Sequence, residues 1–588
     1  MRLILRFWRE YASRHLISYS LGILFLLLTN GLSVLIPRLI QWSIDALEQH
    51  HSALWLGMAL LGAGLGTMIV RTLSRTFIFN PGRTIEYELK QDLFAHLLKL
   101  PKSFYEKSMS AGEIINRGTN DSAAVRGLVG YGALQLFNVA ITLAFTLSQM
   151  LLIDLTLTLW CAIPLSFAAI ILRWAVLQMF TLHHMIMSQT GELGDRILES
   201  YAGVSLVRLF GAMPGVLQRF SAENQSLLSL SERVQTIGVW LLPIVSVMGN
   251  VCVVLALYIG GSQIKSGTLS LGELSAMIVY INLLVSCLTS LGWLTGAIQR
   301  GYISLGRLYE VLDHPIERAQ PTHSLPSCDV KGRGLTIRGL SFRHPTGDID
   351  RLNVLSLQVN PGEVLGIFGL TGAGKSTLLD VLSRTYEPPP NTVFIDGVDI
   401  TSVPVEEYWT EVGYVQQTPY LFSQSLRQNI ALAGERDHGE GGEGELAQAI
   451  QAACLDAEVS AFPKGLETKV GERGITLSGG QKQRTSLARV FYRNQVRLLL
   501  LDDVLSAVDH HTENKLIQSI YRREPQCTTV IVSHRMSVLQ GADQIIVLQE
   551  GEIVERGAPE ILKTSGGIYA QAWEKQNNHH DREQQESP

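Results

Sequence analysis

The chain has 588 residues, too many for one globular core, so more than one domain is expected. Hydrophobic residues make up 46% of it and charged residues only 17%, which excludes a disordered chain and points to a membrane protein. The formal net charge is only −5, which gives no general field to hold a polyanion, so no nucleic-acid partner is expected.

The first 15 residues place four arginines among apolar residues at helical spacing. A cleaved signal peptide is the alternative, but the apolar run that follows is too long for one. The pattern predicts a helix over 1–15 that lies on the inner membrane face in contact with lipid.

Six stretches are apolar and long enough to cross a bilayer of about 30 Å, and all of them lie in the first 300 residues. They are Leu16–Ile36, Ala53–Val70, Gly127–Ile153, Leu155–Leu172, Val234–Ile264 and Leu274–Gln299. The sequence therefore predicts an α-helical six-span transmembrane domain over 16–312.

Basic residues set the expected orientation. The long connections after the second and fourth spans are rich in lysine and arginine, whereas the opposite loops are short and carry almost none. Both termini are therefore expected in the cytoplasm, most simply at a bacterial cytoplasmic (inner) membrane. The two connections have helical periodicity; their turns, near Asn116–Asp121 and Gly211–Gly215, either are simply solvated or dock on the soluble domain.

A proline-rich stretch follows the last span and predicts a linker over 313–332. Beyond it, short apolar runs such as VLGIFG and VRLLLLDD indicate buried strands of an α/β domain over 333–575. Residues 576–588 are expected to form a polar tail, and the glycine- and glutamate-rich stretch 434–445 a flexible insertion.

A P-loop pattern, GxxxxGK[ST], lies between a predicted strand and a predicted helix. Its glycines allow consecutive N–H groups and the helix N-terminus to face phosphate oxygens. Lys375 would add a charge at the β- and γ-phosphates of ATP, and Ser376 would offer a hydroxyl to Mg²⁺. The predicted phosphate-binding residues are Gly369, Leu370, Thr371, Gly372, Ala373, Gly374, Lys375, Ser376 and Thr377.

Asp502 and Asp503 end a second buried strand, expected to neighbour the P-loop strand. A carboxylate in that position can hold Mg²⁺ through water. Asp502 is the candidate for that role, although paired aspartates at a strand end are often only a solvated turn.

The motif LSGGQ lies between the P-loop and Asp502, and the chain here resembles the half-transporters of ABC exporters. The residues that match the motifs of this family are Leu477, Ser478, Gly479, Gly480 and Gln481 of the signature motif, Gln417 of the Q-loop, Asp509 of the D-loop and the switch histidine His534. The resemblance implies an ABC exporter transmembrane domain joined to an α/β P-loop NTPase nucleotide-binding domain, with ATP and Mg²⁺ as cofactors. It also implies a dimer in which each P-loop closes on the partner's signature motif.

Within that resemblance, Gln417 and Asp502 would complete the metal shell with Ser376, and His534 would contact the γ-phosphate. The residue after the metal-binding aspartate is ordinarily a glutamate that acts as the general base, but here it is Asp503. Because aspartate is one methylene shorter, this chain's own site is expected to bind ATP and hydrolyse it slowly. That pattern resembles the degenerate-site subunit of a heterodimeric multidrug- or lipid-type ABC exporter; a homodimer with two slow sites is the alternative.

His344 occupies the position of the tyrosine that usually stacks on adenine. An imidazole offers a flat face, so stacking is possible but weaker and more sensitive to pH. A solvent-facing loop histidine without a role is the alternative.

The spans carry almost no charged residues, with Arg38, Asp154 and Arg173 at or beyond their edges. The leading hypothesis is therefore ATP-driven export of small amphipathic, drug-like or lipid-like substrates by alternating access, with a second ABC half-transporter as partner. A peptide exporter and an ATP-gated channel or regulatory subunit are the competing functions.

Overall fold

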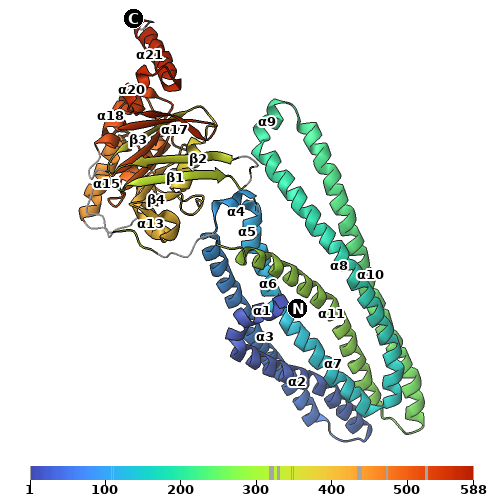
Figure 1. The fold of residues 1–588 in the computed structure, drawn as a ribbon. Helices are drawn as coiled ribbons and strands as arrows, with labels where there is room; N and C mark the ends of the chain where they lie inside the picture. Colours follow the sequence, from blue (N-terminus) through green and yellow to red (C-terminus); the bar gives the residue numbers. More distant parts are fainter. Residues whose placement is uncertain are drawn as a thin grey trace. The chain divides into compact units, whose positions relative to one another are not determined.

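A computed structural model describes residues 2–107, 109, 111–316, 323–326, 332–345, 347, 350–433, 440–471, 474–506, 508–522 and 527–586. The chain divides into two compact units. The membrane unit comprises Met1–Lys99 and Ala111–His314, and the ATPase unit comprises Leu100–Ser110 and Pro315–Pro588. Figure 1 colours both by sequence.

The membrane unit is helical throughout its described residues. Its helices are α1 (Arg2–Glu10), α2 (Leu16–Glu48), α3 (Leu54–Leu97), α5 (Ala111–Asn116), α6 (Ser122–Gly127), α7 (Ala133–Ile153), α8 (Leu155–Ala202), α9 (Val204–Leu209), α10 (Met213–Lys265) and α11 (Leu271–Leu312). A 3-10 turn at Ala12–His15 leads into α2, and π-helical turns at Arg117–Asp121 and Leu128–Gly132 join α5, α6 and α7.

Six of the described helical segments are long and apolar enough to cross a membrane, which confirms the predicted spans. Each is longer than its prediction; α10 alone has 53 residues. Prolines at positions 37, 81, 164 and 243 lie inside these helices, as membrane helices tolerate. Because the helices continue beyond their apolar windows, hydropathy marks only the bilayer-crossing part of each one.

The helices α2, α7, α8, α10 and α11 share one packed core near the turns that join α2 to α3, α7 to α8 and α10 to α11. This distal end, as we call it, gathers those three turns (Figure 1). Its core includes Val34, Met150, Leu157, Cys252 and Tyr280, all less than 9% exposed. Toward the opposite end, α8 and α10 run side by side as a pair.

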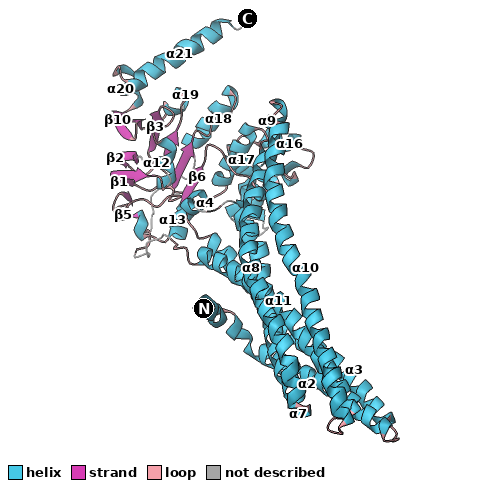
Figure 2. Ribbon diagram, turned by 90° about the vertical axis from the view of Figure 1, so that its right-hand side faces the viewer, coloured by secondary structure: helices cyan, strands magenta, loops and turns pink. Residues whose placement is uncertain are grey.

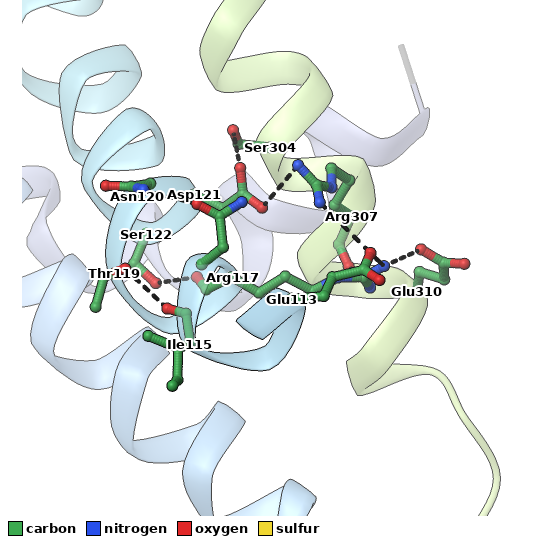
Figure 3. Close-up of polar contacts among 11 residues, drawn as sticks. Glu113, Ile115, Arg117, Thr119, Asn120, Asp121, Ser122, Ser304, Arg307 and Glu310 are labelled. Carbon is green, nitrogen blue, oxygen red and sulfur yellow. Dashed lines mark hydrogen bonds and ion pairs between the residues drawn. The ribbon is translucent and has the colours of Figure 1, made fainter. Parts of the chain in front are cut away.

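A polar cluster ties the turn Arg117–Asp121 to α11 (Figure 3). Arg117, only 4% exposed, donates to the carbonyl of Arg307 at 2.6 Å and pairs with Glu113 and Glu310 at 2.9 Å each. Asp121 accepts from the hydroxyl of Ser304 at 2.6 Å and lies 3.5 Å from Arg307. The turn expected near Asn116–Asp121 therefore packs within the membrane unit.

The segment that belongs to the ATPase unit is instead Leu100–Ser110, with the short helix α4 (Lys102–Lys107). Leu100 and Phe104 are buried at 6% and 3% exposure. A docking segment thus precedes the predicted turn in the chain.

The ATPase unit contains two sheets. One has the order β2-β1-β4-β5 and the other β10-β9-β3-β8-β7-β6, in which only the β9–β10 pair is antiparallel. The strands are β1 (Leu335–Arg343), β2 (Asp350–Val359), β3 (Val364–Gly369), β4 (Val393–Ile395), β5 (Val398–Asp399), β6 (Val412–Val415), β7 (Leu498–Asp502), β8 (Thr528–Val532), β9 (Gln544–Gln549) and β10 (Glu552–Gly557).

Helices cover the larger sheet on both faces, and β3 and β7 are buried at every position, as the predicted α/β domain requires (Figure 2). The helices are α12 (Lys375–Leu382), α13 (Val405–Glu411), α14 (Leu426–Ile430), α15 (Glu440–Ala452), α16 (Asp456–Ala461), α17 (Gly479–Phe491), α18 (His510–Tyr521), α19 (Met536–Leu539), α20 (Pro559–Thr564) and α21 (Ile568–Glu586).

Two stretches that were expected to be polar are partly helical. The expected tail 576–588 is helical as far as Glu586, because α21 continues through it. The expected flexible insertion is helical from Glu440, where Leu446 is buried and Arg427 pairs with Glu443 at 2.7 Å. Residues 434–439 of that insertion lie outside the described part of the chain.

Candidate nucleotide site

The site is built at the carboxyl ends of three parallel strands. Ile367 of β3 pairs with Val532 of β8, and Val532 pairs on its other side with Asp502 of β7. The P-loop follows β3, His534 follows β8, and Asp502 ends β7, so one sheet edge collects all three. The expected direct pairing of the Asp502 strand with the P-loop strand is wrong, because β8 lies between them.

Glycines allow the loop after β3 to turn tightly. Gly372 and Gly374 adopt φ values of +86° and +98°, which other residues rarely adopt. A Cβ on Gly374 would also lie 2.7 Å from the carbonyl oxygen of Arg351. The loop therefore presents a bare backbone, and α12 begins at Lys375 directly after it.

Lys375 is buried inside this loop. Its Nζ donates to the carbonyls of Gly369 at 2.7 Å and Leu370 at 2.9 Å. Burial lowers the pKa of Lys375, and the nearby carboxylates of Asp502 and Asp503 oppose that shift. A cation held this way, with its charge only partly compensated, is suited to attract phosphate oxygens.

Asp502 is 4% exposed and lies near the hydroxyl of Ser376. Burial raises the pKa of Asp502 above its ordinary value; Ser376 and Lys375 lower it, while Asp380 and Asp503 add to the rise. The predicted metal-binding residues Ser376 and Asp502 thus lie near one another.

Asp503 leaves β7 with φ at +48° and is 9% exposed. Its N–H donates to the carbonyl of Val532 at 3.0 Å, which fixes it beside the end of β8. Burial and Lys375 lower the pKa of His534, whereas Asp503 raises it. Lys375, Asp503 and His534 therefore lie close enough to act on one another electrostatically.

Gln417 is exposed, and its backbone carbonyl accepts from Nε2 of Gln483 at 3.3 Å. Gln483 is also 3.4 Å from the hydroxyl of Ser506, which donates to the carbonyl of Asp503 at 2.9 Å. The predicted Q-loop residue is thus linked to Asp503 through its backbone.

The signature motif forms the start of α17. Ser478 is the N-cap and makes a reciprocal capping box with Gln481, with Gly479 and Gly480 in the first turn and Leu477 buried at 7% exposure. Among the described residues, no hydrogen bond or ion pair connects Leu477–Gln481 with Gly369–Thr377. Asp509 caps α18 by accepting from the N–H of Thr512 at 3.0 Å.

His344 is half-buried and its ring lies edge-on to Tyr386, with the centroids 4.7 Å apart. The hydroxyl of Tyr386 donates to Glu106 of α4 at 2.6 Å, and Lys102 of α4 lies 4.8 Å above the Tyr386 ring. Lys102 also pairs with Asp380 of α12 at 3.2 Å. The docked segment therefore contacts both the His344 aromatic cluster and the P-loop helix.

Sequence reasoning did not find these α4 contacts or Gln576. Gln576 of α21 donates to the carbonyl of His534 at 2.7 Å and accepts from the N–H of Met536 at 3.0 Å. Each is a single polar residue on a helix, a pattern too common to single out without the fold.

Comparison with known proteins agrees with this arrangement. Residues 19–288 match the ABC transporter transmembrane region, and residues 352–506 match the ABC transporter ATPase family. The chain is 32% identical to the probable multidrug resistance ABC transporter ATP-binding/permease protein YheI of Bacillus subtilis, covering 95% of each chain. It is 30% identical to a fatty acid ABC transporter ATP-binding/permease protein of Mycobacterium tuberculosis, covering 88% of this chain and 79% of that protein.

The solved structure of a bacterial Atm1-family ABC exporter with ATP bound has the same fold, with a TM-score of 0.84 at 24% identity over 96% of this chain and 99% of that one. The chain has six spans and a P-loop ATPase, and its relatives share nearly its whole length. It therefore belongs to the ABC transporters, as an exporter-type membrane domain fused to a C-terminal ATPase.

Proposed function

We propose that this chain is one half of an ATP-driven exporter of small amphipathic, drug-like or lipid-like molecules in a bacterial cytoplasmic membrane, with both termini in the cytoplasm. The observation that carries the proposal is the single sheet edge where Lys375, Asp502, Asp503 and His534 meet, in a chain that also supplies six spans. Relatives named for multidrug resistance and for fatty acids support amphipathic cargo.

The P-loop binds the phosphates of ATP. The bare backbone of Gly369–Gly374 and the buried ammonium of Lys375 fit a polyphosphate, with Ser376 and Thr377 completing the loop. The face of His344 would receive the adenine, and His534 would contact the γ-phosphate.

Mg²⁺ fits the same edge. It prefers oxygen ligands, and the hydroxyl of Ser376 lies near the carboxylate of Asp502, with Gln417 as a further amide ligand. When bound, the metal neutralises phosphate charge. Among the described residues no cluster of three or more His, Cys, Asp or Glu side chains forms a dedicated cage, as is usual for a metal that shares its ligands with a nucleotide.

Hydrolysis at this site is proposed to be slow. Asp503 stands where a glutamate base would, and the shorter side chain would leave the attacking water misplaced by about 1 Å. The signature motif, in contrast, is intact and properly capped. We therefore propose a heterodimer in which this chain's P-loop site is degenerate and its signature motif completes a competent site on the partner's P-loop.

Transport in proteoliposomes tests the proposal. The complex, purified with its native partner, should accumulate a fluorescent amphiphile inside inverted vesicles when ATP is supplied. Replacement of Lys375 with alanine should weaken ATP binding at this chain's site, because it removes the loop cation. An absence of ATP-dependent uptake for every amphiphile and drug probe would contradict the exporter function.

Two other functions remain distinguishable by experiment. An ATP-gated channel or regulatory subunit would suit a slow Asp503 site, and it would show unitary currents in a planar bilayer with ATP. A pump should show uptake and no unitary currents. A peptide exporter would accumulate labelled peptides in preference to amphiphiles in the same vesicles.

A further inference from the structure

Arg38 is a cation just beyond the apolar stretch Leu16–Ile36 of a membrane-spanning helix. It lies on α2 within the span Ala12–Glu48, ten residues before the helix ends, or about 15 Å at 1.5 Å per residue. Apolar and aromatic residues follow it, including Leu39, Ile40 and Trp42. An ionisable side chain that borders the hydrocarbon ordinarily has a partner or a function.

Its partners in the structure are neutral. Nε donates to Oε1 of Gln149 on α7 at 2.9 Å, and Nη1 donates to Oε1 of Gln41 at 2.8 Å. Among the described residues no carboxylate lies within ion-pair distance of Arg38. The guanidinium charge is therefore solvated by two amides and compensated by neither.

Three acids of the distal end are engaged elsewhere. Asp45 accepts from the N–H of Gly272 at 3.1 Å, Asp154 accepts from Leu157 and Gln263, and Glu273 accepts from Ser270 in a capping box. Each of these carboxylates stabilises a turn or a helix end. None of them neutralises Arg38, so the local charge balance lacks an anion.

The same place has a surplus of hydrogen-bond donors. Because the two amides turn their Oε1 atoms to the guanidinium, their Nε2 groups and the Nη2 of Arg38 are donors with no acceptor in the described part of the chain. Gln41 is 6% exposed, so its amide is held inside the helix packing. A group with several acceptor oxygens and a negative charge would satisfy these donors together.

The position suits an amphiphile. Arg38 borders the distal core: it follows Val34 by one helical turn, and Gln149 precedes Met150, which belongs to the same core. Trp42, one turn beyond Arg38, is 48% exposed, as is typical of a residue at the boundary between hydrocarbon and headgroups. An acidic headgroup could therefore reach Arg38 while its chain stays in apolar surroundings.

We infer that Arg38, Gln41 and Gln149 form an anion subsite that binds the carboxylate or phosphate of an acidic amphiphile at the distal end of the membrane unit. This inference rests on the proposed export of amphiphiles and specifies the charge of the preferred substrate. The same chemistry could come from a transported acid or from the headgroup of a resident anionic lipid.

The test uses the full complex in phosphatidylcholine vesicles and two probes, a fluorescent dodecanoate and its neutral amide. Wild type should respond to the acid at about a tenfold lower concentration than to the amide, measured as stimulated ATPase activity and as uptake. Arg38→Gln should remove this preference and keep amide transport. Lys265→Gln removes an exposed distal cation outside the subsite and should change nothing.

Gln149→Glu guards against a folding defect in the Arg38 variant. It places a carboxylate on the guanidinium, which should stabilise the packing and yet abolish the preference for the acid. If wild type does not distinguish the two probes, anionic phosphatidylglycerol in the vesicles should still raise basal ATPase activity in wild type only, which assigns the subsite to a lipid headgroup.

An unchanged response to acid, amide and phosphatidylglycerol in both Arg38→Gln and Gln149→Glu would overturn the subsite while leaving amphiphile export intact. If wild type transports neither probe and responds to no lipid, export of amphiphiles and the subsite both fail.

Discussion

At the residue scale, the proposed slow hydrolysis of ATP depends on Asp503. Its backbone is fixed by the hydrogen bond to Val532, so the missing methylene cannot be recovered by a small shift of the loop. Asp503→Glu should raise ATP turnover at this site by at least about tenfold, since a 1 Å misplacement can cost about 100-fold. Asp503→Asn, which removes the base, should lower it. Single-turnover hydrolysis on the purified complex measures both, and an unchanged rate in Asp503→Glu would show that the methylene is not limiting.

His534 gives the same site a pH dependence. Burial and Lys375 lower its pKa, so the folded protein favours the neutral imidazole at pH 7 and disfavours its protonation. The kcat/KM for ATP should stay level as pH falls to about 6.5, the ordinary pKa of histidine, and decline only below it. His534→Ala should be slower throughout and lack this acid limb. An acid limb above pH 6.5 that depends on His534 would contradict the assigned shift.

At the element scale, α4 is bound to the ATPase unit through Glu106. The hydroxyl of Tyr386, itself 4% exposed, donates to that carboxylate, and such a charged hydrogen bond contributes about 1.5–3 kcal/mol. Tyr386→Phe should weaken α4 docking and reduce the stimulation of ATPase activity by transported substrate. Glu106→Gln keeps an acceptor and should retain most of the stimulation. Equal stimulation in wild type and Tyr386→Phe would mean that this contact does not couple substrate transport to ATPase activity.

The Arg117 cluster makes a second prediction for an element. Arg117 holds Glu113, Glu310 and the Arg307 carbonyl from a buried position (Figure 3), and leaving that carbonyl without its donor costs about 1–3 kcal/mol. Arg117→Leu should lower the thermal unfolding temperature in detergent. Arg196→Leu removes a solvent-exposed pair with Glu223, worth about 0–1 kcal/mol, and should have little effect. Similar unfolding temperatures for the two variants would contradict a stabilising role for the cluster.

Much of the fold could be predicted because hydropathy and motif spacing are local signals. The six spans follow from apolar length, and the P-loop follows from its glycines and its flanking strand and helix. Strand order could not be predicted the same way, because nothing in Leu498–Asp502 indicates that β8 separates it from β3. The sequence also does not show that Leu100–Ser110 belongs to the ATPase unit. The helical periodicity around Phe104 is the same whether this side chain packs on the membrane unit or on the ATPase unit.

The extent of helix in the polar segments could not be predicted from composition. Glycine and glutamate in 434–445 favour a loop, yet burial of Leu446 and the pair between Arg427 and Glu443 stabilise a helix from Glu440. The capping role of Gln576 on the His534 segment depends on α21, which composition alone suggested would be a tail. In each case tertiary contacts overrode a weak local preference.

At the scale of the whole molecule, the proposed function requires a partner. A P-loop site that closes on another chain's signature motif cannot be completed by one copy. This chain's P-loop site and its signature motif also differ in how complete they are. Its P-loop site carries Asp503, whereas its signature motif is intact. In a homodimer both sites would be slow, and in a heterodimer one site could turn over at full speed.

The subunit composition of the native complex tests this claim most directly. The chain, carrying a tag, would be extracted in mild detergent from its own membranes and its mass measured by native mass spectrometry, with each subunit identified. The account predicts one tagged copy of 64.9 kDa together with one different subunit of similar size. Two copies of this chain, and no other subunit, would contradict the asymmetric pair of ATP sites.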